Sequence, residues 1–252
     1  MLNSVTGLGD MITSKVKLLC CFLVLIYAMT GTALASPGSG AFVYSSDAGN
    51  ELVYYQVRLI DFHGVAAREV VWECGSMQAR HVLQQSDGKP LYALRKDLQK
   101  HEEVEVIYGL HRGEPTLYRR HAGTGVVERR IDQDGLLDLG GLPAMLIPAL
   151  AGRDVFRFSA LNYADGKVYD FRAMPTGYRQ VATAAGRVRC ALIEVKLDSW
   201  LSALTPSVQL VLPLSQAGLP FIAYSGPALA GSGSISLRLV GASPSLAMLE
   251  TR

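Results

Sequence analysis

RDVFRFSALNYADGKVYDFRAM, residues 153 to 174, alternates apolar and polar side chains on both sides of the dipeptide Asp165-Gly166. A period of two is the pattern of a β-strand with one buried face, and Asp-Gly is a strong signal for a two-residue hairpin turn. The expected partners are Asn162 with Tyr169, Ala160 with Phe171 and Phe158 with Ala173 on an apolar face, and Leu161 with Asp170 and Ser159 with Arg172 on a polar face. The stretch therefore predicts an antiparallel hairpin with one face in the core and the other in water.

The stretch TLYRRHAGTGVVERRI, residues 116 to 131, predicts a second hairpin with a four-residue loop at 122–125. This pairing sets Arg119 opposite Glu128 and Tyr118 opposite Arg129. An arginine cluster could bind an anion, but opposite charges on paired strands stabilise each other. We therefore interpret the cluster of Arg119, Arg120, Arg129 and Arg130 as a charge-paired, solvated ribbon.

Alternation and turn signals predict further strands, and Asp87-Gly88 predicts another turn. The predicted strands span residues 52–60, 67–73, 103–109, 187–197, 208–212 and 233–240. In the strand at 187–197 the apolar phase shifts between Leu192 and Ile193, as at a β-bulge or in a strand covered on both faces.

The exception to alternation is GLLDLGGLPAMLIPALAG, residues 135 to 152, where Pro143 and Pro148 exclude one long helix and favour two short segments. Its leucines indicate a buried connection that caps one end of the sheet. The functional alternative is a mobile apolar lip over a ligand cavity, or a surface that touches a bilayer. The predicted fold is all-β: one strongly curved antiparallel sheet or incomplete barrel over residues 51–240, with a short helical connection near 135–152. Residues 36–50 and 241–252 are expected to be flexible.

The N-terminal region resembles a cleavable export signal. Lys15 and Lys17 precede an apolar run, LLCCFLVLIYAM, which is followed by Ala33-Leu34-Ala35. A basic region, a short apolar run and an A-x-A site are the parts of a secretory signal peptide, and the run is shorter than the ~17 residues that cross a bilayer. We expect cleavage after Ala35, translation from Met1 or Met11, a periplasmic mature protein and no transmembrane span after processing. An uncleaved anchor, or a lipoprotein attached at Cys20 or Cys21, is the alternative.

Composition limits the partners and the chemistry of the mature chain. The full chain has a formal net charge of +2, and the chain after Ala35 has +1; a charge this even argues against nucleic acid, which demands a basic stripe. Beyond the signal only Cys74 and Cys190 remain, and in an oxidising compartment they either form a disulfide or sit buried as small apolar residues. The spacing leaves both possibilities open.

No catalytic or metal-binding motif stands out. The five histidines, at 63, 81, 101, 111 and 121, lack the spacings that converge on a metal, and each is interpreted as a surface residue. There is no G-x-S-x-G elbow, and Ser86-Asp87-Gly88-Lys89 is interpreted as a turn rather than a nucleophile pair. We therefore expect neither an enzyme nor a cofactor. Core packing is expected for Trp72 and Trp200, and lining a ligand cavity is their functional alternative.

The stretch ATAAGRVRCALIEVKL, with Gly186 ahead of Cys190 and an alternating strand, followed by VQLVLPLS, PFIAY and SISLRLV, resembles a family of bacterial periplasmic proteins called domain of unknown function 3108. Tyr55, Val57 and residues 64–67 resemble that family's opening strand and turn. The resemblance implies a secreted, β-rich envelope protein and supplies no catalytic residue. The leading hypothesis is a non-catalytic protein that binds a lipid or glycolipid on the concave face of the sheet. The alternative is a structural or assembly module that holds partner proteins of the envelope through its sheet edges.

Overall fold

A computed structural model describes residues 39–47, 51–111, 113–123, 125–183, 186–203, 205–214, 219–227 and 234–243. The chain divides into two units, residues 1–35 and 36–252, and the fold belongs to the second unit. The predicted signal peptide lies outside the described residues. Within the described ranges, no helix is long and apolar enough to cross a membrane.

The described part of the chain forms one antiparallel sheet of fourteen strands, and the predicted all-β class is confirmed. The strands are β1 Gly40–Ser46, β2 Leu52–Phe62, β3 Val65–Cys74, β4 Met77–Gln84, β5 Pro90–Asp97, β6 Glu102–Ile107, β7 Thr116–Ala122, β8 Gly125–Ile131, β9 Phe156–Leu161, β10 Val168–Thr183, β11 Gly186–Leu197, β12 Val208–Pro213, β13 Ala223–Pro227 and β14 Ser234–Ser243. Strands β1 to β8 follow one another as a meander, and so do β9 to β14. The two meanders are joined where the first strand pairs with the last, β1 with β14.

The sheet is strongly curved. Laid flat, fourteen strands at about 4.8 Å spacing would separate the edge strands by roughly 60 Å. Instead the hydroxyl of Tyr118, on β7 near one edge, donates a hydrogen bond of 2.9 Å to the carbonyl of Tyr163, which follows β9 at the other edge. Leu161 of β9 also packs with Val104 and Val106 of β6. No β-ladder joins β8 to β9 in the described residues, so the sheet is an incomplete barrel.

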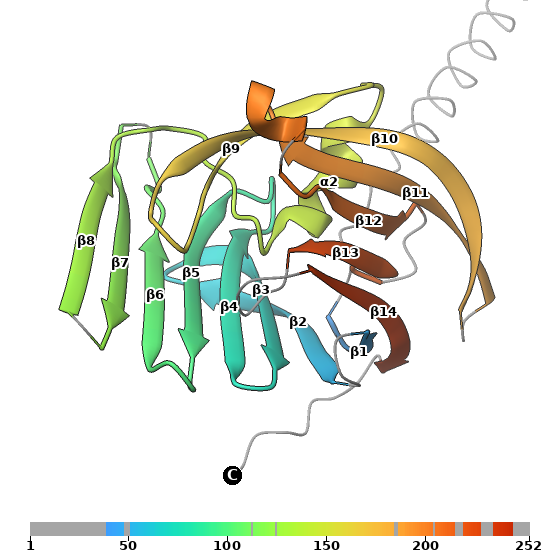
Figure 1. Cartoon of the computed structure of the whole chain (residues 1–252), viewed down its shortest axis with the longest axis horizontal. Helices are drawn as coiled ribbons and strands as arrows, with labels where there is room; N and C mark the ends of the chain where they lie inside the picture. The colour runs from blue at the N-terminus through green and yellow to red at the C-terminus, as the bar shows by residue number, and fades with distance from the viewer. Residues whose placement is uncertain are drawn as a thin grey trace, which may run out of the picture. The chain divides into compact units, whose positions relative to one another are not determined.

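The connection between the meanders fills the inside of the curve (Figure 1). Its helix α2, Leu142–Leu150, buries Leu142 and Leu146 in the main core and contacts β10 and β12. The prediction of two short segments at 135–152 is wrong, because one helix includes both prolines. Pro143 lies in the first turn, where the backbone N–H has no partner within the helix. Pro148 lacks the N–H for one backbone hydrogen bond, close to the C-terminal end of the helix.

The hairpin β7–β8 has the predicted partners, with Arg119 opposite Glu128 and Tyr118 opposite Arg129. In the hairpin β9–β10 the strands are confirmed but the partners are shifted by two residues, so that Ala160 faces Tyr169 and Phe158 faces Phe171. The loop has four residues, 163–166, because the Asn162 side chain accepts the N–H of Ala164 and the Asp165 side chain accepts that of Lys167. A shift of two keeps each residue on its face. Leu161, expected on the polar face, is buried because it packs with Val104 and Val106 of β6.

The predicted turn at Asp87-Gly88 is confirmed, and it repeats the same loop. The Gln84 N–H donates to the Lys89 carbonyl, and the Gly88 N–H donates to the Gln84 carbonyl. In the β9–β10 loop the Asn162 N–H donates to the Lys167 carbonyl, and the Gly166 N–H donates to the Asn162 carbonyl. Asp87 accepts the N–H of Lys89. Both glycines adopt positive φ, +74° for Gly88 and +64° for Gly166.

Each predicted strand range overlaps an observed strand, with two further differences. The segment 36–50, expected to be flexible, contains β1, whose alternate residues Phe42, Tyr44 and Ser46 are buried between β2 and β14. The bulge expected between Leu192 and Ile193 lies on the partner strand, where the register shifts between Pro175 and Gly177 opposite that pair.

Candidate functional site

We call the side of the sheet that carries α2 and the core the inner face. A buried polar cluster of His81, Asp138 and Tyr163 lies on it. His81 of β4 is 2% exposed and Asp138 is 0% exposed, and the imidazole Nδ1 lies 2.7 Å from Asp138 Oδ2. The Tyr163 hydroxyl and the Gly140 N–H both donate to Asp138 Oδ1. The interpretation of His81 as a surface residue is therefore wrong.

Gly140 makes the His81 contact possible. A Cβ on Gly140 would lie 2.1 Å from the His81 ring, so only glycine lets the chain pass this close. Burial raises the pKa of Asp138, but the charge of His81 and the hydrogen bonds outweigh it, and the pKa is lowered overall. Burial, reinforced by Asp138, raises the pKa of Tyr163 well above its usual value, so Tyr163 remains a hydroxyl donor. His81 Nε2 is buried without a hydrogen-bond partner in the described part of the chain. The cluster connects β4, the segment that contains Asp138 and the chain after β9 through buried polar contacts.

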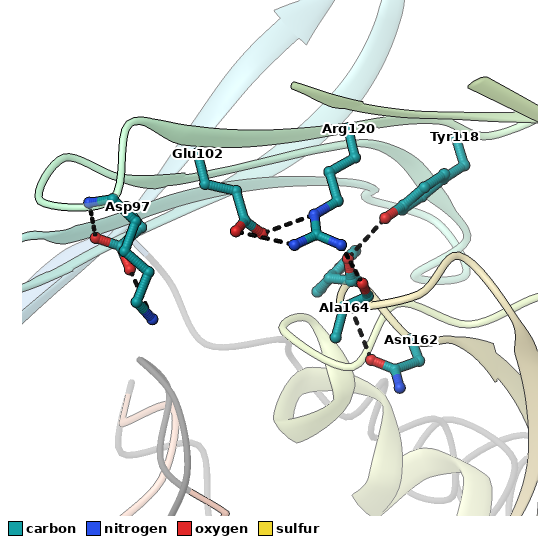
Figure 2. A network of polar contacts seen from close by, with 8 residues as sticks. Asp97, Glu102, Tyr118, Arg120, Asn162 and Ala164 are labelled. Carbon is teal, nitrogen blue, oxygen red and sulfur yellow. Dashed lines mark hydrogen bonds and ion pairs between the residues drawn. The ribbon is translucent and has the colours of Figure 1, made fainter. Parts of the chain in front are cut away.

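A latch on β6 and β7 holds the β9–β10 loop, residues 163–166, in place (Figure 2). Arg120 donates through Nε and Nη2 to the Glu102 carboxylate at 3.0 and 3.1 Å, and through Nη1 to the Ala164 carbonyl at 2.9 Å. The Gly166 backbone lies against the Tyr118 ring, which a Cβ would approach to 2.7 Å. This latch presents Tyr163 to Asp138, and it connects one edge of the sheet to the other.

The outer face carries a continuous polar ladder across seven strands. Its members, from β2 to β8, are Arg58, Glu69, Arg80, Tyr92, Glu105, Arg119 and Glu128. The interpretation of a charge-paired ribbon holds for Arg119, which contacts Glu128 at 2.7 Å and Glu105 at 3.3 Å. Arg120 instead points to the other side of β7 and forms the latch. The two faces thus differ sharply, with ion pairs outside and an apolar interior with few polar groups inside.

Helix α2 is the apolar feature of the inner face. Its sequence LPAMLIPAL has no polar side chain, and only Leu142 and Leu146 are buried. Pro148 is exposed, and the other side chains are partly buried, with Ile147 and Leu150 packed against the core. Met145 touches the β4–β5 loop, since a Cβ on Gly88 would lie 2.9 Å from its Cγ. Apolar surface therefore faces solvent along the length of the helix.

The sequence analysis did not identify Arg68, a buried cation on the inner face. Arg68 of β3 is 5% exposed, and its Nε has no hydrogen-bond partner among the described residues. Alternation with Val70 and Trp72 places Arg68 on the core side, although a charged side chain is seldom buried there. Glu69 takes the outer position between Arg58 and Arg80.

A pocket of about 340 Å³ lies where β5, β6 and β7 meet the chain that follows β8. Two of its charged lining groups already have partners: Lys89 Nζ donates to the Leu110 carbonyl at 2.6 Å, and Glu114 accepts the N–H groups of Leu110 and His111. The pocket therefore offers a ligand little unpaired charge, and the inner face around α2 is the stronger candidate.

The candidates predicted from sequence are not brought together. Trp72 of β3 is 7% exposed and belongs to the main core, whereas Trp200, in the 3-10 turn Trp200–Ala203, is 82% exposed. Cys74 and Cys190 are free thiols in the structure, and both are buried. Burial, with the nearby Glu51 carboxylate, raises the pKa of Cys74 to about 11. Within the described ranges, no three His, Cys, Asp or Glu side chains gather as a metal site would require.

No protein-family model matches the chain, and no curated protein matches it. Among solved structures the chain is similar to a beta-barrel-like protein of domain of unknown function DUF1849 from Brucella abortus. The TM-score is 0.59 at 11% sequence identity, and the alignment covers 83% of this chain and 99% of the other. Identity this low is informative about the fold alone. The chain thus has a β-barrel-like fold found in a domain of unknown function, and the comparison does not single out domain of unknown function 3108.

Proposed function

We propose that this chain is an exported, non-catalytic protein of the bacterial periplasm, related to domain of unknown function 3108, that binds a lipid or glycolipid on its inner face beside α2. The observation that carries the proposal is the composition and placement of α2. A helix without polar side chains covers the inside of the curved sheet, and only two of its side chains are buried.

The energetics favour an exchange of α2 for an alkyl chain. A helix of nine residues is unstable alone in water, so packing holds α2 in place. Burying two leucines contributes about 3 to 6 kcal/mol, whereas each buried methylene of a ligand contributes about 0.8 kcal/mol. An alkyl chain of about ten carbons therefore offsets the displacement of α2. Because the exposed side of α2 is also apolar, a shifted helix can cover the bound chain.

Native mass spectrometry of protein purified from a periplasm, with organic extraction of the same sample, tests the proposal. We expect bound lipid and saturable binding of a fluorescent fatty acid. Ile147→Glu places a charge on the partly buried side of α2, and we expect it to weaken binding at least tenfold. Leu117→Glu, at an exposed position on β7, is the matched control and should leave binding unchanged. A clean apo mass, together with no saturable fatty-acid binding, would overturn the proposal.

One observation favours a second candidate, an assembly module of the envelope. Strand β8 is a terminal strand of the sheet, and six of its seven residues are exposed. An open strand edge can add a strand from a partner protein. The other terminal strand, β9, is already bridged by Leu137 at Ala160. Crosslinking in envelope fractions separates the two functions, because an assembly module yields a stoichiometric protein through β8 and a carrier yields lipid.

A further inference from the structure

Arg68 is a buried cation without a countercharge. Its side chain lies on the inner face of β3, in phase with the core residues Val70 and Trp72. In the part of the chain that the structure describes, no carboxylate pairs with it, and its Nε makes no hydrogen bond. Its electrostatic contact is with the Tyr55 hydroxyl, and burial lowers the pKa of the guanidinium.

A lone buried charge is costly. Proteins seldom bury arginine unless a carboxylate, a phosphate or several hydrogen bonds compensate for the lost hydration. Among the described residues, the buried carboxylates near this region already have partners: Asp138 binds His81, Tyr163 and the Gly140 N–H, and Glu69 pairs with Arg58 and Arg80 on the outer face. Arg68 therefore retains its capacity to pair with an anion from outside the chain.

Arg68 is connected to the start of α2 through one intervening residue, Leu83. In the β3–β4 ladder Arg68 is paired with Leu83, and paired side chains on one face lie about 5 Å apart. Leu83 in turn packs on Gly141, the N-cap residue of α2, where a Cβ would lie 2.6 Å from its methyl groups. No side chain caps this helix end and its first turn has no acidic residue. The positive end of the helix and the position of Arg68 on β3 thus both adjoin Leu83 on the inner face.

We propose that Arg68 binds the anionic group of the ligand, a carboxylate or a phosphate, while the alkyl chain runs along α2. This inference rests on the proposed function and deepens it, since it defines the ligand as an anionic amphiphile. The planar guanidinium can donate two parallel hydrogen bonds to such a group, and exclusion of water strengthens them. The raised pKa of Tyr55, caused by burial, keeps its hydroxyl protonated as a further donor.

Four probes with the same twelve-carbon chain test the inference: dodecyl phosphate, dodecanoate, dodecanol and dodecyltrimethylammonium. Isothermal titration gives the affinity of each for the wild type, Arg68→Met, Arg68→Lys and Arg58→Met. Arg58 is the control because it lies on the outer face and pairs with Glu69. We expect the wild type to bind the anionic probes about tenfold or more tighter than dodecanol. Arg68→Met should lose this preference and keep its affinity for dodecanol within about twofold, Arg68→Lys should be intermediate, and Arg58→Met should match the wild type.

Thermal unfolding without ligand shows whether each variant folds. Arg68→Met should melt at or above the wild-type temperature, because it removes an uncompensated buried charge. Equal affinity of the wild type for dodecanol and dodecanoate would overturn the role of Arg68 and leave the proposed function standing. Binding of none of the four probes would overturn both. If inorganic phosphate alone stabilises the wild type as strongly as dodecyl phosphate, the site binds free anions, and the assignment of an amphiphile is wrong.

Discussion

The contact between Gly166 and the Tyr118 ring, which joins the two ends of the curved sheet, can be tested with three glycines of similar φ. Gly64, Gly88 and Gly166 have φ of +82°, +74° and +64°, so alanine at each carries a similar backbone cost of about 1 kcal/mol. Their surroundings differ. A Cβ on Gly64 meets nothing within 4 Å, one on Gly88 meets the flexible Met145 side chain at 2.9 Å, and one on Gly166 meets the Tyr118 ring at 2.7 Å.

The expected losses of unfolding free energy follow from these distances. Gly64→Ala should cost about 1 kcal/mol, and Gly88→Ala about 1 to 2 kcal/mol because Met145 can move aside. Gly166→Ala should cost about 3 kcal/mol, since Tyr118 is 1% exposed and its hydroxyl is bonded to the β9–β10 loop, so displacing the ring adds an overpacking penalty. Urea unfolding followed by the fluorescence of the buried Trp72 gives all three values. If Gly166→Ala falls within about 0.5 kcal/mol of Gly64→Ala, the loop does not dock on β7 as described.

Three further predictions concern the buried cluster, the latch and the thiols. Asp138→Asn should cost about 3 kcal/mol, because it leaves buried His81 without its charged partner. Because the pKa of Asp138 is lowered in the fold, ionised Asp138 stabilises the folded state fully above its unfolded pKa, near 4, and this stabilisation is lost as the pH falls through the lower folded value. Urea titrations from pH 7 to pH 3 should show this loss of unfolding free energy in the wild type and not in Asp138→Asn. A double-mutant cycle with Arg120→Met and Glu102→Gln should give a coupling of about 1 kcal/mol that shrinks in 1 M salt, since both side chains are partly exposed, and an absence of coupling would mean that the latch is not formed in solution. Cys74 and Cys190 should remain unalkylated in the native protein at pH 8 and each take one label in urea, whereas an intact mass two daltons lower with no label would show a disulfide.

Local patterns in the sequence were sufficient for the strands and insufficient for the loops. The partners of the β7–β8 hairpin were predicted because both strands and the turn are contiguous and their charges match. The β9–β10 hairpin was misjudged by two residues, since Asp-Gly was interpreted as the whole turn. The side chains of Asn162 and Asp165 instead build a four-residue loop, and Asp87-Gly88-Lys89 repeats it. Within this chain, Asp-Gly-Lys therefore marks the end of a four-residue loop.

The inner-face site depends on contacts between distant parts of the chain. His81 and Asp138 are 57 positions apart, and although alternation with Met77 and Ala79 places His81 on the core face, nothing near it in the sequence identifies its partner. Only the fold shows that Gly140 leaves room for the imidazole ring. Arg68 was concealed for a different reason. Alternation with Val70 and Trp72 places it on the inner face, whereas its charge favours an exposed position, so the two sequence signals conflict.

The sheet and the connection between its meanders contribute to the site in different ways, and this limits what a sequence pattern can reveal. The sheet supplies Arg68, His81 and the latch, all at positions set by a period of two. The connection supplies Asp138, Gly140 and α2, which follow no period and are placed by contacts with the sheet. Alternation, the strongest signal in the chain, therefore predicts the wall of the incomplete barrel and not what lies inside it. Since a ligand on the inner face must compete with α2 for the same apolar surface, substitutions on the partly buried side of that helix should alter binding more than substitutions on the outer ladder.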